Sequence, residues 1–559
     1  MTPAVTSDGP ADFPQTFGAL LRESARRHPD RAAVVGYRDG ARSENRVAMT
    51  YAGLDRAADR LARALARAGY AKTADRPGRW LAILSPNEVD YAAVHFGAAR
   101  AGCPLAHVSV RANAAGRAEM LAGVGAELLF VHADLAGDAR ALLAGLPALE
   151  RIVVIGGAAG PDSLDAFTAD APDGDPLVAV HPDDPAAVTF SSGSTGAPKG
   201  VLVSHRNRTL ASCLGAQAFE LADDDVMACT TPLFHVAGLF MWLQIGIRRG
   251  LTVVLLEKWA PDLFADAVER DVATAAFLVP SQVTALLDDP AAAARVRQED
   301  GGLRHLNISG APMPSGLLER ALSAWPGLEI VEHYGQSESC PLAYRPAAFA
   351  RSKPMSAGRP CVEMAVLDRD GRPLPQGEAG EVASRGAHTL LGYVGEDSGE
   401  DIGGGAELAA LRAGDGWLRT GDIGRIDEDG FLHLIDRSKD VIVSGGENIF
   451  PAEVERALYL HPAVRECAVF GVPDDRWGEV PAAHVVANGA GGGGDDETAG
   501  GSGALPDEAA LIDFVVARIP RYKRPRFVKF VDALPRTAIG KIQKNRIRAE
   551  YWKGRDRAI

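Results

Sequence analysis

Apolar residues recur at helical spacing from Leu54 to Ala68, where the pattern LDRAADRLARALARA stops at Gly69. The next apolar run, Trp80 to Leu84, is short and continuous, which is typical of a buried strand. A second helical pattern follows it from Tyr91 to Ala101. Because strand-like and helical patterns alternate, the first half of the chain predicts parallel sheets covered by helices. Two further strands are expected at 128–131 and 152–155.

The pattern changes in the second half of the chain. Residues 371–386 contain short β-like runs separated by Gly and Pro turns, and strand and helix patterns resume from Val464 as a compact group. The segment 488–503 (NGAGGGGDDETAGGSG) and, more weakly, 395–405 offer little apolar area to bury, so both are expected to be disordered loops. The pattern therefore predicts an α/β protein with a β-rich part and a separate C-terminal unit.

Composition narrows the class of protein. A chain of 559 residues is too long for one hydrophobic core, so two or more domains are expected. The net charge of −14 has the wrong sign for a general nucleic-acid binder, and the longest apolar stretches, such as 239–247, are too short to span a bilayer. The six cysteines form no Cys-x-x-Cys pair, and no basic segment followed by an apolar core opens the chain. These features predict a cytoplasmic protein with no secretory signal and no disulfide framework.

The segment FSSGSTGAPKG, at residues 190–200, carries the most functional information. Its glycines let the backbone approach a ligand and leave N–H groups to donate to phosphate oxygens. Its hydroxyls and lysine add donors and positive charge. The segment therefore predicts a triphosphate cradle, with a flexible surface loop as the alternative. It is not a Walker loop, because Pro198 stands where that pattern needs glycine and Lys199 is followed by Gly200.

Five further segments place polar and small residues on predicted turns. In HYGQSESC (333–340), Tyr334 is suited to lie flat on a nucleobase, and Glu338 is a candidate ligand for Mg²⁺, which prefers oxygen donors. Asp422, in TGD, presents a carboxylate for the hydroxyls of a ribose, and Lys541 lies on a Gly-flanked turn in LPRTAIGKIQK. Taken singly, each has a structural alternative, as a core tyrosine, a solvated carboxylate or a surface lysine. The other two segments are NISGAPM (307–313) and DRSKDVIVSGGENIFPAEVE (436–455).

Five segments resemble the adenylate-forming enzymes in their sequence and in their order along the chain. They are FSSGSTGAPKG, YGQSE, TGD, DRSKD…GGENIFPAEVE and PRTAIGK. This superfamily includes acyl-CoA synthetases, peptide-synthetase adenylation domains and luciferases, and the resemblance extends from Phe17 to Trp552. It implies a large N-terminal AMP-binding domain (1–436) of several subdomains, with mostly parallel sheets and a β-rich subdomain. It further implies a hinge (437–440) and a small, mobile α+β C-terminal lid domain (441–559). ATP, Mg²⁺ and coenzyme A are the implied cofactors.

The resemblance assigns nucleotide-binding roles to residues of both predicted domains. Thr195 is a main contact of the β- and γ-phosphates and, with Glu338, holds Mg²⁺. Lys541 matches the lysine that bridges the attacking carboxylate and the α-phosphate, and the implied catalytic set is Lys541, Glu338, His235 and Thr195. The implied nucleotide site comprises Ser191, Ser192, Gly193, Ser194, Thr195, Gly196 and Lys199 at the phosphates; Gly310, Ala311, Pro312, His333, Tyr334, Gly335, Gln336 and Ser337 around the adenine; and Asp422 and Arg437 at the ribose.

The resemblance also implies a second half-reaction, in which the acyl group passes from AMP to a thiol, and this step needs a hinge and an acceptor. The resemblance places Lys439 at the hinge, where a backbone change lets the lid rotate between the two steps. Tyr522-Lys523-Arg524 resembles the stretch that grips the CoA nucleotide, with a solvated basic turn as the alternative. No carrier-protein module follows the predicted lid, which favours free coenzyme A, although an acyl-AMP ligase that loads a separate carrier protein stays open. The implied CoA site comprises Ser444, Gly445, Gly446, Glu447, Trp477, Tyr522 and Arg524.

The segment PLFHVAG (232–238) bears on the acid substrate. It places His235 where peptide-synthetase adenylation domains usually carry an aspartate that pairs with an α-amino group, which disfavours amino acids. In acyl- and aryl-CoA ligases this histidine borders the acyl pocket, and a buried structural histidine is the alternative. Because Ala237, Gly238 and Gly310 are small, the first hypothesis is a medium- or long-chain aliphatic acid, followed by an aryl or cinnamate-like acid. The implied pocket comprises His235, Val236, Ala237, Gly238, Leu239, Gly310, Tyr334 and Gly335, with walls from Met241, Val279 and Pro280.

The leading functional hypothesis is an ATP-dependent carboxylic acid–CoA ligase that forms an acyl-adenylate and then a thioester. A catalytically silent nucleotide-binding protein is the alternative from another class, and the presence of Lys541, Glu338 and Asp422 argues against it. The expected partner is a small carboxylic acid. Neither nucleic acid nor a membrane span is expected, and a homodimer stays open.

Overall fold

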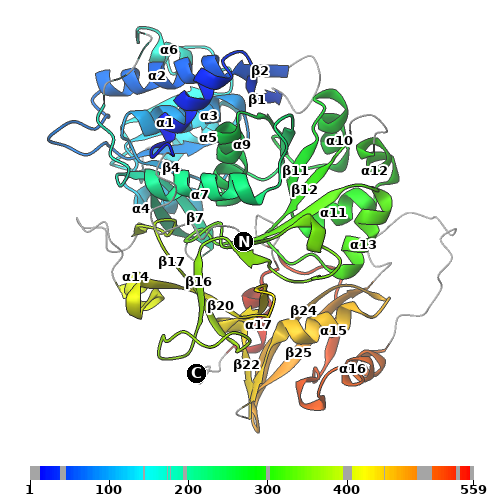
Figure 1. Ribbon diagram of the computed structural model, residues 1–559. Helices are drawn as coiled ribbons and strands as arrows, with labels where there is room; N and C mark the ends of the chain where they lie inside the picture. Colours follow the sequence, from blue (N-terminus) through cyan, green and yellow to red (C-terminus); the bar gives the residue numbers. More distant parts are fainter. Residues whose placement is uncertain are drawn as a thin grey trace. The chain divides into compact units, whose positions relative to one another are not determined.

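The computed structural model describes residues 13–37, 46–142, 145–172, 174, 176, 178–192, 198–297, 302–394, 406–445, 447–487, 507–536 and 542–553. The chain forms two compact units (Figure 1). The first holds the residues up to 365 together with 383–418 and 430–432, and the second holds 366–382, 419–429 and the chain from 433 onward. Mixed sheets with helices between them confirm the predicted α/β fold. The domain boundary at residue 436 stays a prediction.

A seven-stranded sheet in the first unit contains the strands predicted from the early apolar runs. Helix α2 (Tyr51–Arg67) begins at Thr50, whose side chain accepts from the Gly53 amide, and buries its apolar stripe, as the 54–68 pattern predicts. The inner pairings from β7 to β6 are parallel, whereas β7, β8 and β18 pair antiparallel. In spatial order the strands are β18 (Gly392–Val394), β8 (Pro198–Ser204), β7 (Pro185–Ser192), β4 (Leu105–His107), β3 (Leu81–Leu84), β5 (Leu128–His132) and β6 (Arg151–Ile155).

A nine-stranded sheet forms the other half of the first unit. Its central strands are parallel, and the helices α10 (Pro261–Arg270), α11 (Pro280–Leu287), α12 (Pro290–Val296) and α13 (Ser315–Ala324) bury their apolar residues with one face of it. In spatial order the strands are β15 (Arg359–Pro360), β14 (Ala343–Arg345), β13 (Glu329–Tyr334), β12 (His305–Ile308), β11 (Ala275–Leu278), β9 (Val226–Cys229), β10 (Thr252–Leu255), β1 (Ala32–Tyr37) and β2 (Arg46–Thr50).

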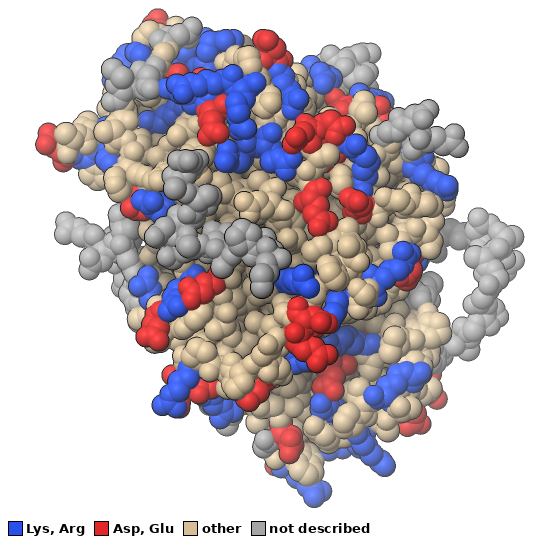
Figure 2. Space-filling view, viewed as in Figure 1, with Lys and Arg blue, Asp and Glu red and all other residues tan. Residues whose placement is uncertain are grey.

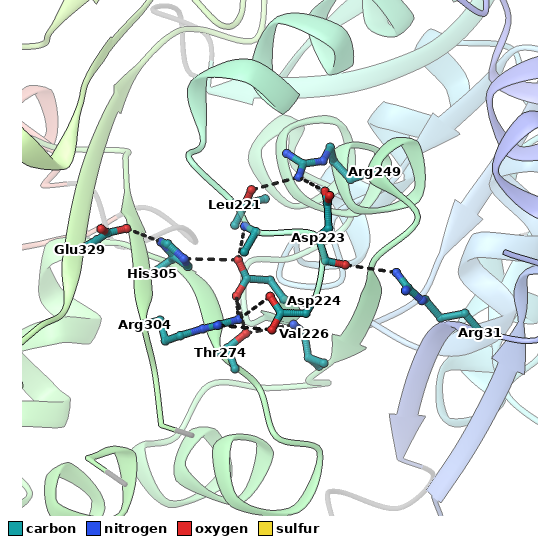
Figure 3. Close-up of polar contacts among 12 residues, drawn as sticks. Arg31, Leu221, Asp223, Asp224, Val226, Arg249, Thr274, Arg304, His305 and Glu329 are labelled. Atoms are coloured by element: carbon teal, nitrogen blue, oxygen red, sulfur yellow. Dashed lines mark hydrogen bonds and ion pairs between the residues drawn. The ribbon is translucent and has the colours of Figure 1, made fainter. Parts of the chain in front are cut away.

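A polar network ties together the amino ends of the parallel strands in this sheet (Figure 3). The buried Asp225 carboxylate accepts from Thr274 Oγ1 at 2.6 Å and pairs with Arg304 at 2.7 Å. His305 lies between two carboxylates: its Nε2 is 3.5 Å from Asp225 Oδ2, and its Nδ1 is 2.9 Å from Glu329 Oε2. The network fixes one edge of the sheet, so the segments after β9, β11, β12 and β13 lie at the opposite, carboxyl edge. Ligands of open α/β sheets bind at the carboxyl edge.

Two smaller sheets complete the structure. One has the order β16 (Glu363–Leu367), β17 (Gly380–Arg385), β20 (Trp417–Ile426) and β19 (Arg412–Ala413), with β21 (Leu432–Arg437) beside β20, and it includes the β-rich stretch predicted at 371–386. The other, in the second unit, has the order β23 (Glu447–Ile449), β22 (Ile442–Ser444), β25 (Gly478–Ala487) and β24 (Val464–Asp474), with β26 (Val528–Phe530) beside β25. Helices α15 (Pro451–Tyr459) and α16 (Glu508–Val516) cover one face of the latter sheet, and α17 (Lys544–Tyr551) contacts β24.

The surface carries charges of both signs. Figure 2 shows Lys and Arg side chains interspersed with Asp and Glu over the visible face. In the part of the chain that the structure describes, no helix is long and apolar enough to cross a membrane. The predicted loops at 488–503 and 395–405 lie outside the described residues.

Among the buried histidines of the first unit, three pack around the rings of Phe17 and Phe240. His95, on α3 (Val89–Arg100), stacks on Phe17 with ring centroids 5.1 Å apart and lies 5.5 Å from the ring of His107 on β4. His205 begins α7 (His205–Ala218) and contacts the ring of Phe17 edge-on at 4.8 Å. Burial lowers the pKa of His95 to about 3 and that of His205 to about 4, and it lowers the pKa of His107 well below its usual value. All three rings are therefore neutral in the folded protein at pH 7.

We predict that these histidines make the stability of the first unit depend on pH. The stabilising effect of the neutral rings is complete above a pH of about 6.5, the pKa of histidine in the unfolded chain. Below that pH the unfolded chain binds protons that the folded chain does not, so each histidine removes about 1.4 kcal/mol of unfolding free energy per pH unit. Urea unfolding between pH 7.5 and 5 measures the slope of the unfolding free energy against pH. His95→Phe should reduce this slope by about 1.4 kcal/mol per pH unit, the contribution of one proton. The exposed His181→Ala is the matched control, and a flat profile for the wild type would contradict the prediction.

Candidate functional site

The Gly- and Ser-rich segment is the tip of a β-hairpin. Strands β7 and β8 pair antiparallel up to Ser191 opposite Lys199 and Ser192 opposite Pro198. Residues 193–197 connect these two pairs and lie outside the described residues, so the predicted contacts of Gly193, Ser194, Thr195 and Gly196 are not placed. The hairpin explains how Ser191 and Lys199, eight positions apart in the sequence, come to face each other across a strand pair.

Strand β8 also pairs on its other edge, with β18. Gly200 lies opposite Phe190 on one side and Val394 on the other. A Cβ atom at Gly200 would lie 2.4 Å from Val394 Cγ2 and 3.0 Å from Val188 Cγ1, so only glycine fits between the neighbouring side chains. This pairing brings Tyr393 beside the end of the hairpin.

Tyr393 connects the hairpin lysine to the predicted metal ligand. The Lys199 ammonium lies 5.8 Å from the centre of the Tyr393 ring, within the range of a cation–π contact. The Tyr393 hydroxyl donates to Glu338 Oε1 at 3.1 Å. Tyr393 was not among the residues predicted from the sequence. The available signal was the Gly-Tyr pair that follows the β-like run after residue 380, but its partner strand could not be deduced from the pattern.

The segment that carries Glu338 follows β13 at the carboxyl edge of the nine-stranded sheet. It turns tightly, because the Gln336 and Ser339 backbones exchange hydrogen bonds of 2.9 and 3.2 Å. The Glu338 carbonyl accepts from the Leu390 amide at 2.8 Å, which holds the segment from the side of β18. Residues 334–338 are all half-buried, so this run borders solvent.

The donors at this edge fit a magnesium ion held jointly with a bound nucleotide. Within the described ranges, no three acidic, His or Cys side chains lie close enough to hold a metal alone. Glu338 supplies one carboxylate whose orientation Tyr393 fixes. Mg²⁺ is commonly bound by one or two carboxylates together with phosphate oxygens and water, so a single carboxylate beside the hairpin predicted to bind phosphate is a suitable donor set.

His333 is buried, unlike the half-buried run that follows it. Its Nε2 lies 2.6 Å from Asn307 Oδ1, and its ring centroid lies 3.9 Å from that of Phe219. Burial lowers the pKa of His333 to about 3, so the ring is neutral. Its predicted place beside an adenine stays a prediction, as do those of the residues exposed in the turn after β12, Gly310, Ala311 and Pro312.

The predicted substrate segment, 232–238, contains the half-buried His235, which caps a short helix, α8 (Val236–Gly238). The His235 Nδ1 accepts from the Ala237 amide at 3.2 Å, so the neutral ring carries its proton on Nε2. A Cβ atom at Gly238 would lie 2.5 Å from the Pro232 carbonyl oxygen. The small size of Gly238 therefore serves backbone packing and leaves no room for a substrate tail. Three other residues predicted at the pocket are buried in the main core: Val236, Leu239 and Met241.

The predicted ribose ligands meet in the second unit. Arg437 Nε lies 3.3 Å from Asp422 Oδ1, and the Asp422 amide donates to Thr420 Oγ1 at 3.1 Å. The neighbouring Asp436 accepts from its own following amide at 2.8 Å and from the Ala452 amide at 2.7 Å. Burial raises the pKa of Asp436 to about 6. The predicted hinge residue, Lys439, lies in the short turn (Ser438–Asp440) that follows this anchored stretch.

Four of the predicted CoA residues lie together at the start of β25 in the same unit: Ser444, Gly445, Glu447 and Trp477. Ser444 pairs with Glu447 and with Gly478, and the Gly445 amide donates to the Trp477 carbonyl at 2.9 Å. Trp477 and Tyr522 are exposed by 39% and 51%, which is unusual for large aromatic side chains and suits a ligand-binding surface. Arg524 donates to the Arg521 carbonyl at 3.1 Å. Gly446 lies outside the described residues.

The predicted catalytic lysine, Lys541, also lies outside the described residues, but the two ends of its segment are placed. Arg536 and Ile542 form an antiparallel bridge, and the Gln543 amide donates to the Pro535 carbonyl at 2.8 Å. In sequence, Lys541 immediately precedes this bridge, which belongs to the second unit.

Comparison with known proteins gives matches over nearly the whole chain. The model for AMP-binding enzymes matches residues 21–394, and the model for the AMP-binding enzyme C-terminal domain matches 453–541. A feruloyl-CoA synthase from Amycolatopsis sp is 36% identical over 90% of this chain and 94% of its own length. An indoleacetate–CoA ligase from Aromatoleum aromaticum is 33% identical over 89% and 92%. The crystal structure of ATP-bound MatB from Rhodopseudomonas palustris superposes with a TM-score of 0.81 at 26% identity, covering 97% of this chain and 99% of MatB.

We predict that Tyr393→Phe weakens ATP-dependent acid activation without unfolding the first unit. The change removes the hydroxyl that donates to Glu338, and a hydrogen bond to a charged group is worth about 1.5–3 kcal/mol. The ATP–pyrophosphate exchange rate should fall about tenfold or more. The control is Tyr70→Phe, which should leave the rate unchanged. Tyr70 is far from Tyr393 and Glu338 in the sequence, and its ring packs under the Arg79 guanidinium. Equal rates for Tyr393→Phe and wild type would contradict a role for this bond.

Proposed function

The chain belongs to the family of AMP-binding enzymes and is an AMP-forming acid–CoA ligase, and we propose that its acid substrate is an aryl or arylalkyl carboxylic acid. The support is the aromatic ring carried by the acids that two relatives act on, and the core next to the His235 segment is itself built from aromatic rings. Trp242, on the π-helix Leu239–Leu243 that follows α8, lies 5.6 Å from Phe277 and 5.9 Å from Phe219. The ring contacts continue through His333 to Tyr344, whose ring centroid is 6.4 Å from that of His333.

A ring-bearing acid bound beside this aromatic core would gain ring-to-ring contacts. Offset or edge-on ring pairs contribute about 0.5–1.5 kcal/mol beyond the burial of their area. The two relatives named above act, by their names, on a ferulic and an indoleacetic acid, both of which carry a ring. The alternative of a medium- or long-chain aliphatic acid rested in part on the small size of Gly238, which backbone packing accounts for.

We propose that the triphosphate of ATP binds the hairpin and that Glu338 faces the magnesium ion. When bound, Mg²⁺ neutralises charge on the phosphate oxygens. Asp422 would accept from the ribose hydroxyls, and Arg437, at 3.3 Å, would hold its carboxylate in place. Tyr334 would lie on the adenine. The hydroxyl, amide and ammonium donors to the phosphates would come from Ser191, Ser192, Gly193, Ser194, Thr195, Gly196 and Lys199.

The proposed reaction proceeds in two displacements. In the first, a carboxylate oxygen of the acid bonds to the α-phosphorus, and pyrophosphate leaves with the electrons of the broken P–O bond. Two anions must approach each other here, so a cationic group that meets the developing charge lowers the barrier. In the second, the CoA sulfur bonds to the acyl carbon, AMP leaves, and the thiol proton goes to solvent or base. The Lys439 turn would let the second unit rearrange between the two steps.

We predict that the ligase prefers ring-bearing acids. With ATP, Mg²⁺ and CoA present, ferulic, 4-coumaric and indoleacetic acids should give kcat/KM values at least tenfold above those of octanoic and palmitic acids. A tenfold ratio corresponds to about 1.4 kcal/mol, the size of one favourable ring contact. AMP release measures the rate, and thioester formation is checked by mass. A preference for the aliphatic acids would overturn the substrate proposal while leaving the ligase activity intact.

We predict that Lys541→Ala abolishes adenylation with little effect on ATP binding. Loss of one preorganised donor to a developing charge costs about 3–4 kcal/mol, so the rate of acyl-AMP formation should fall roughly 10²–10³-fold. Pyrophosphate release measures the step, and calorimetry measures ATP affinity. The exposed Lys553→Ala is the matched control on the same terminal segment. A near-wild-type rate in Lys541→Ala would remove this lysine from the reaction.

A further inference from the structure

Arg208 is a charged residue completely buried inside the first unit. It lies on α7, four positions after the Ser204 cap, and its exposed fraction is 0%. The start of α7 is rigid, because Ser204 and Asn207 form a reciprocal capping box with bonds of 3.1 and 2.7 Å. The Asn207 side chain also donates to the Ala387 carbonyl at 2.6 Å. Arg208 therefore projects from a fixed point of the helix that directly follows β8.

The guanidinium contacts the segment that carries Glu338. Nη2 donates to the Ser337 carbonyl, and Nη1 lies 2.9 Å from Cys340 Sγ. The group also lies 5.3 Å from the centre of the Phe240 ring. These contacts bracket Glu338, because Ser337 precedes it and Cys340 follows two residues later. Glu338 itself is held by the Leu390 amide and the Tyr393 hydroxyl.

The partners of Arg208 are neutral groups. Among the described residues, no carboxylate lies within ion-pair distance of Arg208, and its Nε has no hydrogen-bond partner. A buried cation without a counter-anion costs several kcal/mol of desolvation, and an apolar residue of similar volume is usually the more stable occupant. The stability of the fold does not explain why an arginine stands at this position.

We infer that Arg208 is a positioning residue for Glu338. The inference rests on the proposed role of Glu338 in holding Mg²⁺ with ATP. By holding the Ser337 carbonyl on one side of Glu338 and the Cys340 side chain on the other, Arg208 keeps the carboxylate turned toward solvent, where the proposed metal–phosphate group would bind.

The test is the dependence of nucleotide affinity on magnesium, measured by calorimetry with the full chain and α,β-methylene-ATP. The readout is the ratio of affinities with Mg²⁺ and with EDTA. Arg208→Leu should lower this ratio about tenfold, the size expected for losing a charge-assisted hydrogen bond. Arg208→Lys, which keeps the charge but reaches one acceptor, should lie between it and wild type. In the double variant Arg208→Leu/Glu338→Gln, the ratio should equal that of Glu338→Gln alone, because both changes act through the same carboxylate.

A matched control is the neighbouring Arg206→Leu. Arg206 lies on the same helix turn but pairs with Asp183 at 2.6 Å near the surface, so its loss should leave the ratio unchanged. A merely structural role of Arg208 would lower thermal stability and would act additively with Glu338→Gln. If Arg208→Leu does not fold, a wild-type ratio in Arg208→Lys overturns the inference.

The outcomes separate this inference from the proposed function. If Glu338→Gln leaves the ratio at its wild-type value, the proposed metal role of Glu338 is wrong. If Glu338→Gln lowers the ratio and both Arg208 variants leave it unchanged, the metal role stands and the positioning role of Arg208 is wrong.

Discussion

Strand β8 is hydrogen-bonded along both edges, to β7 and to β18, and the geometry of the site in the first unit follows from this double pairing. The β7 pairing closes the hairpin that sets Ser191 opposite Lys199. The β18 pairing carries Tyr393 to the same end, where its hydroxyl reaches Glu338. Gly200 permits both, because a side chain there would collide with Val394. Three segments far apart in the sequence thereby present an ammonium, a phenol and a carboxylate at one edge.

Charge is the second constraint. A chain with a net charge of −14 must attract ATP, an organic acid and CoA, which are all anions. Local groups have to supply the attraction, and the candidates are Lys199 at the hairpin and the basic Arg521–Arg524 turn of the second unit. The candidate residues are divided between the two units, with the phosphate hairpin in the first and Asp422, Arg437 and Lys541 in the second. The proposed reaction in two steps suits such a division, since one unit would bind the nucleotide and the other would change the groups presented to it.

Much of the fold could be predicted from periodicity alone. The apolar runs near 81, 128 and 152 are parallel strands, and the helical pattern from 54 is α2. These elements could be predicted because a strand buried on both faces gives a continuous apolar run, whereas a helix buried along one stripe repeats its apolar residues every three to four positions. The site was predicted less completely. Motif order singled out the 190–200 segment and Glu338, whose roles stay predictions. Tyr393 and Arg208 could not be found in this way, because their positions depend on which strand pairs with β8 and on which side chain packs against the Glu338 turn. His333 and Tyr334 were grouped as neighbours in sequence, yet β13 is buried on both faces up to His333, whereas Tyr334, at its carboxyl end, borders solvent. Gly238 was interpreted as open space because sequence does not reveal that two carbonyl groups fill it.

The most direct measurement is a crystal structure of the protein with α,β-methylene-ATP, Mg²⁺ and a ring-bearing acid. We expect density for the triphosphate between Ser191 and Lys199, with the metal ion bridging the phosphate oxygens and the Glu338 carboxylate. A triphosphate bound away from the β7–β8 hairpin, or a metal ion with no contact to Glu338, would contradict the proposed site.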